Sequence, residues 1–118
     1  MKVARVNGRV IGEGSTDFTA SGSFDKYQPF IVTVTSLNAF GSSLCLMNGS
    51  LSIPYEVDVF DPVTLLKKMI TTSGGSVTIN ADRKHEVNGT FDFKFDIADK
   101  AQSGVFSDVP TVRLALGL

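Results

Sequence analysis

The clearest pattern in this chain is a strict alternation of apolar and polar residues between Val87 and Ile97. A period of two is that of a β-strand with one buried face and one face in water. The apolar members are Phe91, Phe93, Phe95 and Ile97, and the polar members are Asp92, Lys94 and Asp96. Because three phenylalanines on one face need a large cover, we expect the other strands to be arranged around this one.

Similar patterns predict further strands along most of the chain. We expect them at residues 3–6, 9–11, 18–24, 30–37, 44–47, 51–59, 76–81, 105–109 and 112–116. The glycine-rich segment 12–15 is expected to be a loop. Residues 44–47 are apolar at every position, which is typical of a central strand covered on both faces. Pro54 has no N–H to donate to a ladder, so its strand is expected at an edge or with a bulge.

Three Asn-Gly pairs mark candidate tight turns. Asn7-Gly8 and Asn48-Gly49 lie between apolar-bearing runs and predict two β-hairpins, because both turn residues must take positive φ. At Asn88-Gly89 the apolar residues Val87 and Phe91 keep the same parity across the pair. This favours one long strand with a bulge or a close backbone approach over a hairpin tip.

The period changes after Asp61-Pro62. An aspartate followed by proline is typical of a helix N-cap and its first helical residue. Four apolar residues then fall on one helical face, with two lysines opposite, and Gly74-Gly75 ends the pattern. The apolar four are Leu65, Leu66, Met69 and Ile70, and the lysines are Lys67 and Lys68. The sequence therefore predicts one flanking α-helix near residues 62–72.

Together these patterns predict an all-β, mainly antiparallel fold: a β-sandwich or flattened barrel of eight to ten short strands with one flanking α-helix. We expect a single domain over residues 1–118. A chain of this length buries roughly two-thirds of its unfolded surface, so it needs no metal or disulfide for stability.

Composition narrows the function classes. Eleven Lys+Arg against twelve Asp+Glu give no basic field for nucleic acid. Nine Phe, two Tyr and no Trp argue against a carbohydrate or base-stacking platform. No apolar stretch is long enough for a transmembrane segment. Residues 1–8 turn too early for a signal peptide, so we expect either a cytoplasmic or virion protein, or an envelope or secreted protein whose leader has been removed.

Few residues suggest chemistry. The single cysteine, Cys45, lies in an apolar run and is expected to be a buried small hydrophobe. The single histidine, His85, has charged neighbours and is expected to be a solvated turn residue. A catalytic thiol would need this histidine as partner, and a zinc site of the usual kind needs more ligands than the chain offers.

Several carboxylates are candidates for a site. Asp92 and Asp96 share one strand face but lie ~13 Å apart, too far to act on one bond. Asp96, Asp99 and Asp108 would be a conceivable calcium set across a loop, although solubilising surface charge explains them more simply. Strand polarity and helix capping account for Asp58 and Asp61. The segments 12–15 and 73–76 are turns rather than phosphate loops, because no Gly-Lys-Ser/Thr follows. We assign no catalytic, cofactor-binding or metal residue.

Three short motifs follow one another along the chain: residues 75–79, 87–93 (VNGTFDF) and 104–110 (GVFSDVP). In these motifs the chain resembles a family of small β-sandwich lipoprotein-type domains common in Bacteroidota, and residues 4–8 are similar to how such domains begin. The resemblance implies a fold and an outer-envelope setting, and no catalytic residue. The chain departs from that family in having no lipobox cysteine and in its predicted helix.

A sandwich with one helix between strands is also similar, at fold level, to bacteriophage tail-tube proteins and their secretion-system relatives. That likeness implies a protein without an enzymatic site that stacks into rings.

We therefore expect a non-enzymatic structural or interaction module, envelope-associated or secreted, with a protein partner or self-association. The alternative is a self-assembling phage or secretion-apparatus component. The third hypothesis is a carrier of a small apolar ligand lined by the Phe and Tyr residues.

Overall fold

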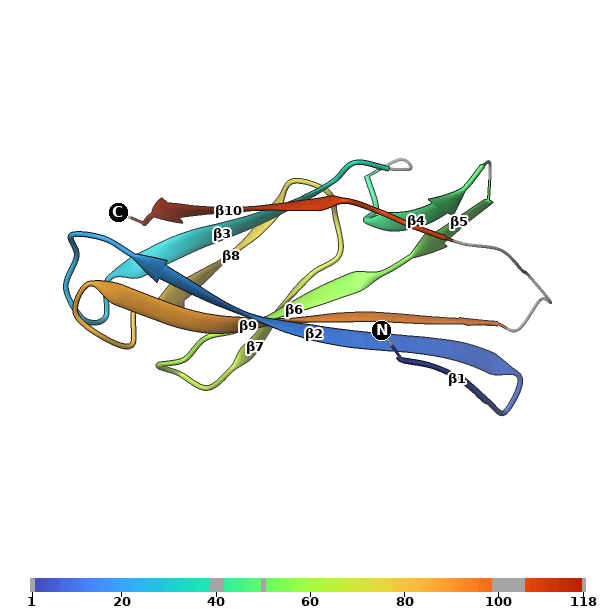
Figure 1. Cartoon of the computed structure of the whole chain (residues 1–118), viewed down its shortest axis with the longest axis horizontal. Helices are drawn as coiled ribbons and strands as arrows, with labels where there is room; N and C mark the ends of the chain where they lie inside the picture. Colours follow the sequence, from blue (N-terminus) through green and yellow to red (C-terminus); the bar gives the residue numbers. More distant parts are fainter. Residues whose placement is uncertain (1, 39–41, 50, 99–105, 118) are drawn as a thin grey trace.

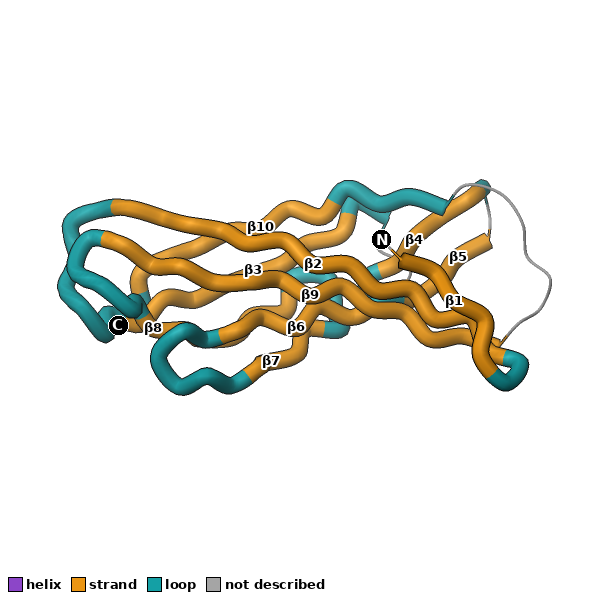
Figure 2. Tube along the Cα trace, turned by 60° about the horizontal axis from the view of Figure 1, so that its bottom comes forward, coloured by secondary structure: helices purple, strands orange, loops and turns teal. Residues whose placement is uncertain are grey.

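The computed structural model describes residues 2–38, 42–49, 51–98 and 106–117. Within these ranges every regular element is a strand and none is a helix, as Figure 2 shows by colour. All strand pairs are antiparallel, so the predicted all-β antiparallel class is confirmed. The strands are β1 (Lys2–Val6), β2 (Arg9–Ser21), β3 (Pro29–Ser36), β4 (Cys45–Asn48), β5 (Leu51–Pro54), β6 (Glu56–Phe60), β7 (Lys67–Ile70), β8 (Gly75–Asn80), β9 (Glu86–Ala98) and β10 (Pro110–Leu116).

The strands form two main sheets and one short hairpin. One sheet has the order β1-β2-β9-β6-β7, the other β10-β3-β8, and β4 pairs with β5. The two main sheets run along the long axis of an elongated molecule of 50 × 26 × 17 Å, with β4 and β5 at one end (Figure 1). This arrangement is consistent with a β-sandwich. In the described part of the chain both sheets keep open edges, so the flattened-barrel alternative is wrong.

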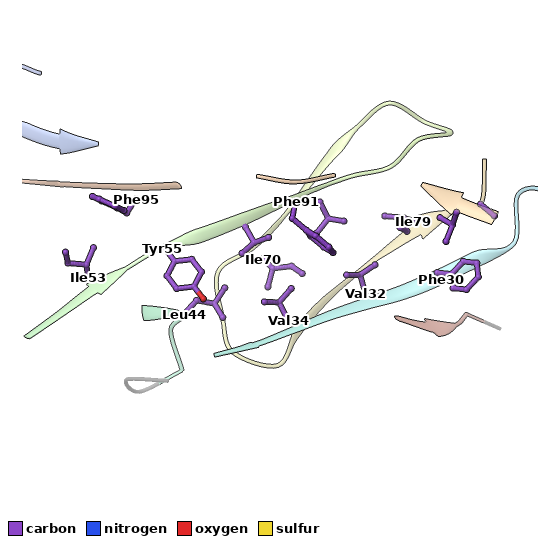
Figure 3. Packing of buried hydrophobic residues seen from close by; sticks show 14 residues of the cluster. Phe30, Val32, Val34, Leu44, Ile53, Tyr55, Ile70, Ile79, Phe91 and Phe95 are labelled. Atoms are coloured by element: carbon purple, nitrogen blue, oxygen red, sulfur yellow. The ribbon is translucent and has the colours of Figure 1, made fainter. Parts of the chain in front are cut away.

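The core lies between the two main sheets (Figure 3). Its members come chiefly from β3, β6, β8 and β9, and they include Phe30, Val32, Val34, Val57, Val59, Ile79, Phe91 and Phe95. The predicted phenylalanine face of β9 is thus the core face. Phe91 and Phe95 are almost fully buried, whereas Phe93 and Ile97 pack against the cluster half-buried.

Two long strands, β2 and β9, form the backbone of the larger sheet. They pair without interruption over thirteen residues each. The loop expected at 12–15 is therefore wrong: Gly12 is a strand residue, and it is small because the ring of Phe95 lies over it. The strand expected at 18–24 begins earlier and ends at Ser21. Asn88-Gly89 stays inside β9, as predicted, because the ring of Phe18 closely approaches Gly89.

The helix predicted near 62–72 is not formed. Asp61 does cap a turn, since its carboxylate accepts hydrogen bonds from the N–H groups of Val63 (2.9 Å) and Thr64 (3.4 Å). The turn then ends at Leu65, whose backbone is left-handed (φ 62°). The N–H of Asp61 next donates to the carbonyl of Leu66 at 2.9 Å, so the chain closes a hairpin and continues as β7.

The shorter turns follow the sequence with small shifts. Asn7 (φ 51°) and Gly8 (φ 76°) form the first predicted hairpin. The second hairpin also forms, but Asn48 pairs with Leu51, so its loop lies one residue later than predicted. The strand expected at 51–59 divides at Tyr55 into β5 and β6, which was not predicted. Pro54 lies in β5, the edge of a two-stranded sheet, as expected.

Two strand predictions need correction. Residues 44–47 do form a strand, β4, but it is not a central one: among the described residues it pairs along its length with β5, and on its other side it has only the single bridge from Met47 to Ser107. Leu44 and Cys45 are nevertheless buried, because they pack on the core rather than between two neighbours. The segment expected at 105–109 contributes a single bridge, Ser107 to Met47, and residue 105 lies outside the described ranges.

Candidate functional site

The sandwich is closed along one flank. There β7 of the larger sheet contacts β8 of the smaller one. The ammonium group of Lys68 donates a hydrogen bond to the carbonyl of Thr78, across the gap between the sheets. Ile70 is almost fully buried beneath this contact. Each strand therefore covers the edge of the other.

The opposite flank is open. In the described part of the chain β10 makes extended contact only with β3. Edge strand β1 of the facing sheet is exposed at all five residues and so covers nothing. Apolar side chains of β2 and β10 pack on the core but stay half-covered; they are Val10, Phe18, Ala20, Val112 and Leu114. We call the edge of β10 together with these five side chains the open flank.

The direction of the β10 hydrogen bonds follows from its register. The N–H of Gly117 donates to the carbonyl of Pro29 at 2.9 Å, so the hydrogen-bonded pairs with β3 fall on alternate residues from Gly117 backwards. Residues 111, 113 and 115 therefore bond to β3. The N–H and C=O groups of Val112, Leu114 and Leu116 point to the free edge. The same residues place their side chains on the inner face.

The four outermost strands of the two main sheets are not protected equally. Natural sheets guard their edges with charged residues or with a covering element. Strand β1 carries Lys2 and Arg5, β7 carries two lysines, and β8 is covered by β7. Strand β10 has seven residues and a single charge, Arg113. In the part of the chain that the structure describes, strand β2 also lacks a neighbour on one side beyond Glu13, where its pairing with β1 ends. Among the outermost strands of the two main sheets, β10 is thus the one best suited to accept another strand.

A polar cluster fixes the start of β10. The carboxylate of Asp108 accepts hydrogen bonds from the hydroxyls of Ser36 (2.7 Å) and Tyr55, and from the N–H groups of Asn38 (3.3 Å) and Val109 (2.8 Å). Burial, together with the neighbouring Asp108 carboxylate, raises the pKa of the Tyr55 hydroxyl well above its ordinary value. Tyr55 therefore remains a neutral donor to Asp108.

The outer face of the larger sheet holds a shallow hollow of about 590 Å³. Charged side chains dominate its lining: Lys2, Glu13, Asp58, Lys67, Asp92 and Lys94. Lys67 lies 3.0 Å from Asp92, which also accepts a hydrogen bond from the Ser15 hydroxyl at 2.7 Å. These hydrogen bonds and the lysine lower the pKa of Asp92. Such a lining gives no support to the apolar-ligand hypothesis.

The structure does not bring the two candidate nucleophilic-site residues together. Cys45 is buried in β4, and its thiol contacts the carbonyl of Ser43 at 3.4 Å. His85 is exposed in the turn between β8 and β9, where its Nδ1 lies 2.9 Å from the carbonyl of Gly22. In Figure 1 that turn and β4 lie at opposite ends of the molecule.

The candidate carboxylates have separate surroundings. Asp96 pairs with Arg9 at 2.5 Å, Asp108 belongs to the polar cluster above, and Asp99 lies outside the described residues. Asp61 is fully buried beside Lys68. Across the residues that the structure describes, no group of three or more His, Cys, Asp or Glu is arranged to hold a metal ion.

The two glycine-rich segments have different conformations. Residues 12–15 belong to β2. Residues 73 and 74 form the turn before β8, where Gly74 has φ 84°, and residues 75 and 76 begin β8. The described residues also contain no helix with the length and apolarity needed to cross a membrane. Sequence reasoning missed the open flank. The low charge of residues 110–116 is visible in the sequence, but the absence of a second neighbouring strand among the described residues is not.

Comparison with known proteins gives little beyond the fold. No family model matches the chain, and no curated protein matches its sequence. One solved structure that it resembles comes from work described as "Chaperone-tip adhesin complex is vital for synergistic activation of CFA/I fimbriae biogenesis". The match has a TM-score of 0.70 and 15% sequence identity, and it covers 98% of this chain but 37% of the other. The likeness is therefore one of fold, to part of a longer chain.

Proposed function

We propose that this protein is a non-enzymatic interaction module that binds a protein partner by accepting a β-strand along β10. One observation carries the proposal: β10 is a long, nearly uncharged edge whose outward N–H and C=O groups belong to its inner-face residues. An extended segment added at this edge would continue the ladder. Its alternate side chains would cover the half-exposed apolar residues of the open flank.

The energetics favour this mode of binding. In strand addition, main-chain hydrogen bonds supply affinity, and pockets for alternate side chains supply specificity. Three residues of β10 present both a hydrogen-bonding edge and an apolar side chain: Val112, Leu114 and Leu116. Leu116 is 56% exposed, so covering it removes apolar surface from water.

The structural comparison supports a protein as partner. The similar structure belongs to a study of a chaperone and a tip adhesin in complex, which is compatible with an interaction module. An envelope-associated or secreted setting is part of the proposal and agrees with the lipoprotein-type resemblance. The helix that suggested a phage tail-tube protein is not formed, which leaves that alternative without the element on which it depended.

Binding of synthetic peptides tests the proposal. A panel of nine-residue peptides with apolar residues at alternate positions is titrated against the protein by fluorescence anisotropy. The informative variant is Leu114→Pro, which removes one N–H from the free edge but none that bonds to β3, a site where proline is tolerated in edge strands. The matched control is Leu114→Ala, which shortens the side chain and keeps the N–H.

We expect at least one peptide to bind the wild-type protein. The Leu114→Pro variant should bind that peptide about tenfold more weakly than the Leu114→Ala variant does. Equal affinity of the two variants, or no binding by any peptide, would overturn strand addition at β10. Light scattering coupled to size-exclusion chromatography separates the self-assembly alternative. A concentration-dependent mass would favour a second copy as the partner, and a constant monomer mass would exclude it.

A further inference from the structure

We infer that Asp108 and Gln28 are positioning residues that hold β10 in place, with its free edge open, before any partner strand binds. The inference rests on the proposed function and adds which side chains prepare the edge. Neither residue belongs to the β10 ladder, and neither would form a backbone hydrogen bond with the added strand.

Asp108 secures the beginning of β10. Its Oδ2 accepts hydrogen bonds from the hydroxyls of Ser36, at the end of β3, and Tyr55, between β5 and β6. Its Oδ1 accepts from the backbone N–H of Asn38 and of Val109. One carboxylate thus joins three parts of the chain at the point where β10 starts. Ser36 and Tyr55 are both almost fully buried, so these hydrogen bonds are shielded from competing water.

Gln28 secures the other end. Its side-chain amide donates to the carbonyl of Gly117 at 3.0 Å and to the carbonyl of Pro29 at 3.1 Å. The N–H of Gly117 donates to the same Pro29 carbonyl. The start of β3 and the end of β10 are therefore held together by a side chain that lies just outside β3.

An edge strand with a single neighbour needs such anchors. Strands with few contacts and solvent-exposed hydrogen bonds open locally at low free energy. If β10 frayed, an incoming strand would have to order it on binding, and that ordering would reduce affinity. Anchoring both ends outside the ladder keeps the edge ordered while its outward N–H and C=O groups stay available.

The test compares two aspartates on opposite flanks, each of which accepts several hydrogen bonds through its carboxylate. Asp108→Ala removes the anchor at β10, and Asp61→Ala removes a buried carboxylate that holds the β6–β7 turn on the closed flank. Gln28→Ala removes the second anchor and serves if Asp108→Ala does not fold. Asp108→Asn retains one acceptor oxygen and should keep part of the peptide affinity that Asp108→Ala loses. Unfolding studies first show which variants are folded. For these variants, amide exchange is measured by NMR, and affinity is measured by titration with the best-binding synthetic peptide.

In Asp108→Ala we expect the β3-bonded amides of Thr111, Arg113 and Ala115 to exchange about tenfold faster than in the wild type, with amides of β2 and β9 unchanged. Peptide affinity should fall about tenfold, whereas Asp61→Ala should leave it unchanged. Equal effects of both aspartate variants on affinity, or unchanged exchange along β10, would refute the inference. If the wild type binds no peptide while the exchange effect is present, the proposed function fails and the anchoring role stands.

Discussion

The phenyl ring of Phe95 lies over the Cα of Gly12 on the neighbouring strand, where an added side-chain carbon would collide with it. Well-packed interiors accommodate an extra methyl group only by straining neighbouring side chains. We therefore expect Gly12→Ala to lower the free energy of unfolding by about 1–3 kcal/mol, measured by urea denaturation. The collision with the Phe95 ring, rather than backbone strain at position 12, should cause this loss of stability.

A double mutant separates these causes. Phe95→Leu removes the ring that meets the new methyl group, so Gly12→Ala should cost clearly less in the Phe95→Leu background than in the wild type. Additive effects of the two substitutions would show that the contact with Phe95 is not what excludes a side chain at position 12.

The phenylalanines of β9 differ in burial, and their truncation should differ accordingly. Phe91 is 4% exposed and stacks on Phe18 with a centroid distance of 4.5 Å. Phe93 is only half-buried and meets Tyr55 at 6.4 Å. We expect Phe91→Ala to cost about 3–5 kcal/mol of stability and Phe93→Ala less. Urea unfolding of both variants measures this order, and a larger loss for Phe93→Ala would contradict the assignment of the core.

Alternation predicted the core correctly because it depends only on the chain itself. A strand residue with its side chain between two sheets must be apolar wherever its partners come from, so the β9 pattern identified Phe91 and Phe95 without knowledge of the strand order. The same holds for Asn7-Gly8, where the turn needs positive φ at both residues. These features are local, and the sequence states them directly.

The helix prediction is wrong because residues distant in the sequence determine the structure of this segment. The apolar residues of 65–70 fit a helical face, yet only Ile70 is buried, while Leu65, Leu66 and Met69 are exposed. Strand β7 forms because β6 offers it a ladder and Asp92 of β9 pairs with Lys67. Neither partner is visible in the local pattern. The open flank was missed for the same reason, because periodicity shows which face is buried and not which strand lacks a neighbour.

The left-handed backbone of Leu65 makes a substitution there favourable. Its φ is 62° and its side chain is 69% exposed, so the residue carries a conformational cost with little burial in return. Leu65→Gly should raise the free energy of unfolding by about 0.5–1 kcal/mol, because glycine adopts this conformation without a Cβ clash. Thermal unfolding followed by circular dichroism measures the change.

The neighbouring Leu66, which is 60% exposed, provides the control for that substitution. The backbone of Leu66 is not left-handed, so Leu66→Gly removes a similar side chain without relieving strain and should not stabilise the protein. Stabilisation by both glycines would point to the loss of exposed apolar surface instead of backbone strain.

The buried carboxylate of Asp61 predicts acid sensitivity. Burial alone would raise its pKa, but hydrogen bonds from Val63, Asn80 and Thr64 outweigh burial and hold the pKa below its ordinary value. A pKa that is lower in the folded than in the unfolded state adds stability above the unfolded value, about 3.9, and this stability is lost as the pH falls through the folded value. We therefore expect the free energy of unfolding to decrease below about pH 4.

Substitution of Asp61 isolates its share of this dependence. Asp61→Asn should be less stable than the wild type at pH 7 and should lose stability less steeply between about pH 4 and 2, because the titrating group is gone. Urea denaturation at several pH values measures both slopes. Asp92→Asn, at a carboxylate on the outer face, is a useful comparison, since its pKa is also lowered. An unchanged slope in Asp61→Asn would assign the acid sensitivity to other carboxylates.

The register of β10 predicts an alternating pattern of amide exchange in the protein alone. The N–H groups of residues 111, 113 and 115 bond to β3 and should exchange slowly, whereas those of Val112, Leu114 and Leu116 point to the free edge and should exchange fast. NMR exchange at low protein concentration measures all six amides in one experiment. Residues 30–34 of β3, which are paired on both sides, provide the control, because all their amides should be slow. Uniform protection along β10 would mean that its edge is already covered, and strand addition would then have to displace whatever covers it.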